Sequence, residues 1–107
     1  MPRVAYVNGR FGPLLSANIH VEDRGVQFAD SVYEVVALIN GHVADERGHL
    51  ERLQRSLKEL RIAMPMSISA LRIVMRELIR RNRILNGGIY IQISRGIAPR
   101  DFKFPKE

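Results

Sequence analysis

The segment from Arg24 to Ile39 holds residues that are well suited to chemistry. A polar, turn-prone opening gives way there to a β-branched run that begins at Val32 and stops at Asn40-Gly41. Such a run favours a strand, and Asn-Gly is typical of a type I′ hairpin turn because both central residues need a positive φ. Tyr33, at the mouth of that strand, could point its hydroxyl into a cleft. By residue type alone, a tyrosine with an apolar ring and a hydrated tip at a sheet edge is the more common case.

An arginine side chain can bind an anion, because guanidinium presents a rigid fork of donors to phosphate or carboxylate. Arg52 falls outside the leucine stripe of a predicted helix, and taken alone it is a surface arginine. Arg100 follows Pro99 after a predicted strand, and the sequence shows no packing role for it. His20 stands without a second histidine or a carboxylate at metal-ligand spacing, so no metal site is predicted.

The N-terminal residues predict a β-hairpin. Asn8-Gly9 is a two-residue turn between strands at Val4–Val7 and Arg10-Phe11. A two-stranded ribbon is only marginally stable by itself, so we expect it to join a larger sheet. Residues 19–21 alternate in character and are expected to form a short extended piece.

Two helices are expected between the central strand and the last one. The first begins at Asp45-Glu46 and ends at Met64-Pro65-Met66, since proline lacks a donor and restricts its predecessor. Its apolar stripe consists of leucines at helical spacing: Leu50, Leu53, Leu57 and Leu60. The second is capped by Ser67 or Ser69 and ends at Asn86-Gly87-Gly88. Its apolar stripe is Leu71, Val74, Met75 and Leu78.

The order of these elements predicts the fold class. Residues 42–44 form a pairing strand after the central turn, and residues 89–94 alternate as a half-buried strand. Strands, two helices and a final strand indicate an α+β domain with a mostly antiparallel sheet packed against two helices. We expect residues 1–98 to form this single domain. Residues 99–107 lack periodicity and are expected to begin a linker to a further, C-terminal domain.

Bulk composition is that of an ordinary soluble domain. The chain has 107 residues, 46% of them hydrophobic. It has no apolar run near the roughly 18 residues that a membrane span requires, so no membrane partner is expected. The absence of cysteine excludes a disulfide framework and a thiolate metal site, and the cytoplasm is the expected location.

The formal net charge of +6 raises the question of nucleic-acid binding. Residues 71–83 carry five arginines against one acid, and those at positions 72, 76 and 80 fall on one helical face. No aromatic residues or glycine-rich loops are interleaved with them to form a base-stacking platform. A solvated arginine face is therefore the better interpretation, and no nucleic-acid partner is expected.

Four separated motifs carry a family resemblance. The longest is RGVQFADSVYEVVALINGHV, which spans residues 24–43. The others are Tyr6-Val7-Asn8-Gly9, His49-Leu50-Glu51-Arg52-Leu53 and Ser94-Arg95-Gly96-Ile97-Ala98-Pro99-Arg100. In this order they resemble the N-terminal domain of the fold-type-IV, pyridoxal-phosphate-dependent aminotransferases, and are most similar to the D-amino acid (D-alanine) aminotransferases.

This resemblance implies a role for each candidate residue. Arg52 matches the arginine that binds the phosphate of pyridoxal 5′-phosphate, and His49 is expected to support that site rather than to transfer protons. Tyr33 and Arg100 match residues that bind the substrate α-carboxylate, Arg100 being supplied by the partner subunit of a homodimer. The implied substrates are an amino acid and a 2-oxo acid.

The sequence also departs from the D-amino acid pattern. Asp101 and Phe102 follow Arg100, where the family usually has a histidine two residues on. Asp101, next to Arg100, would repel a carboxylate, which weakens the case for D-alanine as the substrate. Ala29 and Ser31 replace glycines of the signature, which tightens the space around the backbone.

No catalytic residue is predicted within this chain. The family's Schiff-base lysine belongs to a C-terminal domain, and Lys58, Lys103 and Lys106 do not match it. We therefore expect the N-terminal half of an aminotransferase, inactive by itself. A branched-chain aminotransferase or an aminodeoxychorismate lyase of the same fold is an alternative. A non-catalytic binding module is another.

Overall fold

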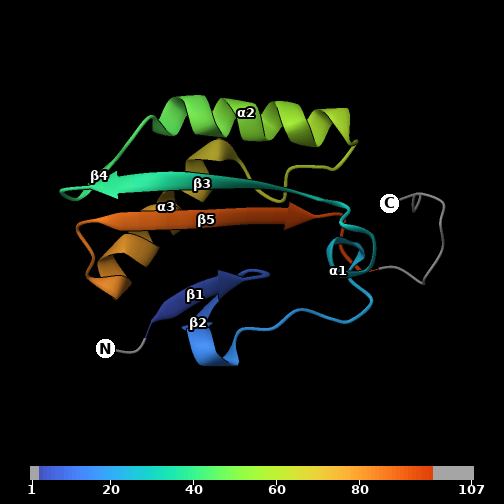
Figure 1. The fold of residues 1–107 in the computed structure, drawn as a ribbon, viewed down its shortest axis with the longest axis horizontal. Coiled ribbons are helices and arrows are strands. Elements are labelled where there is room, and N and C mark those ends of the chain that lie inside the picture. The colour runs from blue at the N-terminus through green and yellow to red at the C-terminus, as the bar shows by residue number, and fades with distance from the viewer. Residues whose placement is uncertain (1–2, 98–107) are drawn as a thin grey trace.

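The structure is a computed structural model that describes residues 3–97, and it is built around a three-stranded antiparallel sheet (Figure 1). The strand order is β4-β3-β5, with β3 at Ser31–Ile39, β4 at His42–Val43 and β5 at Gly87–Ser94. The Asn40-Gly41 turn joins β3 to β4, with φ values of 49° and 80°. The central strand, its turn and the last strand were all predicted from local sequence, and they are confirmed.

The core lies between one face of this sheet and the two long helices, α2 (Glu46–Glu59) and α3 (Ile68–Asn82). Burial alternates along β3, so that its even-numbered residues from Val32 to Leu38 face inward. The cluster of buried apolar residues is Val32, Val36, Leu50, Leu53, Leu57, Ile62, Leu71, Met75, Ile89 and Ile91. This arrangement confirms the α+β class with an antiparallel sheet and two helices.

Helix α2 ends at Glu59, so the prediction that it continues to Met64-Pro65-Met66 is wrong. Arg61 adopts a positive φ of 57° and its N–H donates to the Lys58 carbonyl, while the Ile62 N–H donates to the Leu57 carbonyl. This pair of bonds is a Schellman motif, which ends a helix without proline. Leu60 lies at the helix end and is exposed, so it does not belong to the buried stripe.

Helix α3 begins as predicted and ends earlier than predicted. The Ser67 hydroxyl accepts a hydrogen bond from the Ala70 N–H at 3.1 Å and caps its first turn. Its last residue is Asn82, and Arg83 follows in a left-handed conformation with φ 52°. Gly87 and Gly88 already belong to β5 and do not end the helix.

The N-terminal hairpin is confirmed, but its expected union with the larger sheet is wrong. β1 (Val4–Val7) and β2 (Arg10–Pro13) form a separate two-stranded sheet. Side chains at the end of α3 hold it instead. The Asn82 side chain accepts from the Val4 N–H and donates to the Val4 carbonyl, and the Arg81 guanidinium lies 4.3 Å from the Phe11 ring centroid.

Between this hairpin and β3 the chain forms two short helical turns, η1 (Leu14–Ser16) and α1 (Arg24–Phe28). Residues 19–21, expected to form a short extended piece, belong to no strand, and Val21 begins a turn. Asp23 caps α1 by accepting from the Gly25 N–H at 2.8 Å, and Ala29 ends it with φ 54°. Helix α1 was not predicted from sequence.

The arginines of α3 are exposed but bound in ion pairs. Arg72 and Arg76 contact Glu46 of α2, and Arg80 and Arg81 contact Glu77. Each carboxylate thus neutralises part of the basic face. Within residues 3–97, no helix has the length and apolar character needed to cross a membrane.

Candidate functional site

The two predicted residues on α2 converge on a carboxylate that sequence reasoning missed. Arg52 donates from Nε to Glu34 Oε2 and from Nη2 to Glu34 Oε1, both at 2.8 Å. His49 Nδ1 lies 2.7 Å from Glu34 Oε1. We call these three residues the Glu34 cluster. They meet because the alternation of β3 turns Glu34 toward α2, where residues three apart share a face.

The Glu34 carboxylate is buried and ionised. Its side chain is only 4% exposed. The hydrogen bonds from Arg52 lower its pKa to about 2, outweighing burial, which raises the pKa, and His49 adds a further lowering. In turn, hydrogen bonding to Glu34 raises the pKa of Arg52. The cluster therefore fixes a permanent cation in one orientation.

Arg52 faces solvent despite this pairing. Its side chain is 56% exposed, and it helps to line a shallow hollow of about 210 Å³. The lining residues are Asp45, Gly48, His49, Glu51, Arg52 and Arg55. The pair with Glu34 occupies Nε and Nη2, and no acceptor in the described part of the chain is bonded to Nη1. The arrangement can hold an anion at the outer edge of the guanidinium.

Tyr33 lies apart from this cluster. It is adjacent to Glu34 in the strand and therefore points to the opposite face of the sheet, where the residue is 61% exposed. The ring stacks on Tyr90 of β5, with centroids 5.5 Å apart and planes 4° from parallel. The structure thus brings Arg52 and His49 together but does not bring Tyr33 to them. Arg100 lies outside the described residues.

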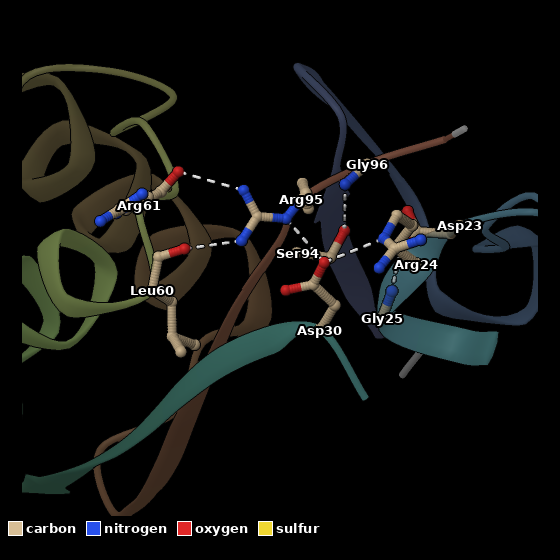
Figure 2. Close-up of polar contacts among 9 residues, drawn as sticks. All are labelled: Asp23, Arg24, Gly25, Asp30, Leu60, Arg61, Ser94, Arg95 and Gly96. Atoms are coloured by element: carbon tan, nitrogen blue, oxygen red, sulfur yellow. Dashed lines mark hydrogen bonds and ion pairs between the residues drawn. The ribbon is translucent and has the colours of Figure 1, made fainter. Parts of the chain in front are cut away.

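A second buried carboxylate, Asp30, lies just before β3 (Figure 2). It accepts from Arg24 Nε at 3.0 Å and from Arg95 Nε at 2.6 Å. Burial raises the pKa of Asp30, but the hydrogen bonds from Arg95 and Arg24 prevail and the net shift is downward. We call these three residues the Asp30 cluster. Sequence reasoning assigned no role to any of them.

The comparison with protein families shows which family this chain belongs to. A profile of the family described as amino-transferase class IV matches residues 31–107. The match begins at β3, which carries both Tyr33 and Glu34, and runs through all of α2. The chain belongs to the class IV aminotransferase family. This confirms the family resemblance drawn from its motifs.

Individual class IV aminotransferases match most of this chain. The D-alanine aminotransferase of Staphylococcus haemolyticus is 40% identical over 100 residues, covering 94% of this chain and 36% of that protein. The branched-chain amino acid aminotransferase of Escherichia coli superposes with a TM-score of 0.90 at 25% identity, covering 99% of this chain and 36% of that one.

A second solved structure shows the shared fold alone. It is the T.th. branched-chain amino acid aminotransferase with pyridoxamine 5′-phosphate, with a TM-score of 0.77 at 24% identity over 86% of this chain. It too is much longer, since the match covers 32% of its chain. The 107 residues therefore span about a third of the length of these class IV aminotransferases.

Proposed function

We propose that this chain forms the N-terminal domain of a pyridoxal-phosphate-dependent aminotransferase, which moves an amino group between an amino acid and a 2-oxo acid. One observation carries the proposal: Arg52 is held by a buried carboxylate yet more than half exposed. A surface arginine without a task gains little from such orientation, because exposed ion pairs contribute about 0–1 kcal/mol. An oriented, exposed guanidinium is what a phosphate requires.

In this proposal Arg52 holds the phosphate of pyridoxal 5′-phosphate and His49 supports it through the shared Glu34 carboxylate. The similarity to an aminotransferase with pyridoxamine 5′-phosphate supports the choice of cofactor. When bound, the cofactor supplies the electron-withdrawing ring that stabilises negative charge at the substrate α-carbon. Glu34 keeps the Arg52 guanidinium from rotating, so that ligand binding costs little ordering of this side chain.

The substrate carboxylate is assigned to Tyr33 and to Arg100 of a partner subunit in a homodimer. Tyr33 can bind the substrate carboxylate because its side chain lies on the sheet face that the helices leave open. The same face exposes Val35 and Tyr90, and an apolar surface of this kind suits burial by a second subunit or a further domain. A phenol and a guanidinium together fix the orientation of a carboxylate.

We assign the substrate to the D-amino acids, with D-alanine as the first choice and the cytoplasm as the location. The 40% identity to a D-alanine aminotransferase supports this choice. A branched-chain substrate is the second candidate, because the TM-score of 0.90 to a branched-chain enzyme shows how well that scaffold fits. Asp101 beside Arg100 is the sequence feature that weakens the first choice.

The test is an amino-transfer assay on the full-length protein with pyridoxal 5′-phosphate and 2-oxoglutarate. D-Alanine is offered in one reaction and L-leucine in another. We expect pyruvate to form from D-alanine, and faster transfer from L-leucine would instead select the branched-chain alternative. Transfer from neither amino acid would contradict the proposal.

The 107-residue chain alone serves as the negative control, and we expect no transfer from it. Borohydride reduction of that chain with the cofactor, followed by peptide mass mapping, should give no stoichiometric adduct on any lysine. An adduct on Lys58 together with measurable transfer would show that this chain is catalytic by itself.

A further inference from the structure

The Asp30 cluster joins three segments that are far apart in the sequence. Arg24 opens α1, Asp30 precedes β3, and Arg95 follows β5. The side chains of all three are nearly inaccessible, at 4% exposure for Arg24, 6% for Asp30 and 10% for Arg95. A single buried carboxylate thus binds two buried guanidinium groups.

Arg95 also reaches the end of α2. Its Nη2 donates to the Leu60 carbonyl at 2.6 Å and its Nη1 to the Arg61 carbonyl at 3.1 Å, as Figure 2 shows. These carbonyls belong to Leu60 and Arg61, the two residues that follow the last residue of α2, where the chain has left the helix. The planar guanidinium therefore binds the helix end on one side and Asp30 on the other.

Backbone bonds hold the same segments together. The Arg95 N–H donates to the Asp30 carbonyl at 3.0 Å, and the Arg24 N–H donates to the Gly96 carbonyl at 2.8 Å. Ile97 forms an isolated antiparallel bridge with Asp23. The chain that leaves β5 is therefore pinned to α1 over residues 95–97.

Each joined segment leads to one of the proposed binding residues. Tyr33 comes three residues after Asp30, and Arg52 lies on the helix whose end Arg95 binds. The cluster thus ties the start of the strand that carries Tyr33 to the end of the helix that carries Arg52.

We infer that Asp30 and Arg95 are positioning residues for substrate binding: they fix the start of β3, which carries Tyr33, against the end of α2, which carries Arg52. The inference rests on the proposed aminotransferase function. Neither residue touches substrate in this account, and each acts through the backbone that it anchors. The opposing interpretation is a cluster that only stabilises the fold.

The decisive experiment compares Arg95→Lys with Arg76→Lys in the full-length protein. Lysine keeps the positive charge beside Asp30 but cannot bond the carboxylate and two carbonyls at once. Arg76 is the matched control, because its guanidinium also forms a two-pronged bond, to Glu46 at 2.8 and 2.9 Å, at the first residue of α2 rather than beyond its last. Circular dichroism is used to check that both variants fold.

For Arg95→Lys we expect the KM for D-alanine to rise roughly 10–100-fold, because a misplacement of about 1 Å can cost this much. We expect kcat to change less, and Arg76→Lys to leave KM unchanged. Equal KM values in the two variants would overturn the inference. If the unsubstituted protein itself transfers no amino group, the failure lies with the proposed function and is recognised before either variant is measured.

Amide hydrogen exchange gives a readout that needs no activity. In Arg95→Lys, the Arg24 and Arg95 N–H groups should exchange about tenfold faster or more, because the bonds they make to Gly96 and Asp30 loosen. In Arg76→Lys they should exchange as in the unsubstituted protein. A raised KM with unchanged exchange would also overturn the inference, since the segment would then be held without this cluster.

Discussion

Two buried carboxylates, Asp30 just before β3 and Glu34 within it, form similar ion pairs that have different roles. Asp30 and Glu34 stand four residues apart, and each binds two basic side chains. In the Asp30 cluster both arginines are almost fully buried. In the Glu34 cluster the acid is equally buried, but Arg52 remains more than half exposed.

This difference separates a structural cluster from a candidate binding site. The Arg95 donors are bound by Asp30 and by two carbonyls, so they hold elements of the fold together. Arg52 is held on one edge only and presents the other to solvent. The exposure of the cation, rather than the presence of an ion pair, therefore indicates where an external anion binds.

The largest expected loss of stability comes from breaking the Asp30 cluster. Asp30→Ala leaves two guanidinium groups buried without their carboxylate, and it should lower the free energy of unfolding by about 3–5 kcal/mol. Urea unfolding measures this loss. Glu77→Ala, which breaks exposed pairs, is the control and should cost far less. Equal losses would remove the distinction between buried and exposed clusters.

A smaller effect is expected at the second carboxylate. Glu34→Gln weakens the bonds to Arg52 and His49, but the released guanidinium can be hydrated. We expect a loss of about 1–3 kcal/mol in urea unfolding, the range for a charge-assisted hydrogen bond. If this loss exceeded that of Asp30→Ala, hydration of the exposed Arg52 would not be reducing the loss of stability in Glu34→Gln.

The pH dependence of stability sharpens the same comparison. Because Arg52 lowers the Glu34 pKa from 4.5 to about 2, the stabilisation is complete above pH 4.5 and is lost as pH falls toward 2. Solvent around the half-exposed Arg52 reduces this contribution to about 1–2 kcal/mol. Thermal midpoints between about pH 6 and about pH 3 should fall less steeply in Glu34→Gln than in the unsubstituted protein. Parallel curves would show that Glu34 is not the titrating group.

The smallest effect concerns the turn at Ala29, just before Asp30. Ala29 has a φ of 54°, which glycine adopts without strain, so Ala29→Gly should stabilise the protein by about 0.5–1 kcal/mol. Gly25→Ala is the contrasting change, because an added Cβ would lie 2.8 Å from the Ser94 Cβ and should destabilise. A loss of stability in Ala29→Gly would contradict this account of the turn.

Local signals in the sequence were sufficient for the strands and the hairpins. The β-branched run from Val32 to Ile39 and the two Asn-Gly turns predicted β3 and both hairpins, since both signals depend on neighbouring residues. The ends of α2 and α3 were missed because Arg61 and Arg83 adopt the left-handed conformation that glycine usually supplies. Nothing in their residue type signals that geometry.

The clusters depend on contacts between distant residues. Glu34 binds Arg52 across 18 positions, and Asp30 binds Arg95 across 65. Such pairs require the tertiary fold, so spacing alone could not identify them. One signal was available: Glu34 occupies an inward position in an alternating apolar strand, and a buried acid needs a bonded partner.

The central claim is that the Glu34 cluster presents Arg52 to a phosphate. It is tested most directly by measuring the binding of pyridoxamine 5′-phosphate and of pyridoxamine to the full-length protein and to Arg52→Gln. Arg47→Gln, an exposed arginine on the same helix, is the control. We predict that Arg52→Gln weakens binding of the phosphorylated compound about 10–150-fold, the equivalent of one charge-assisted contact, and leaves pyridoxamine binding unchanged. An unchanged affinity for pyridoxamine 5′-phosphate in Arg52→Gln would contradict the account.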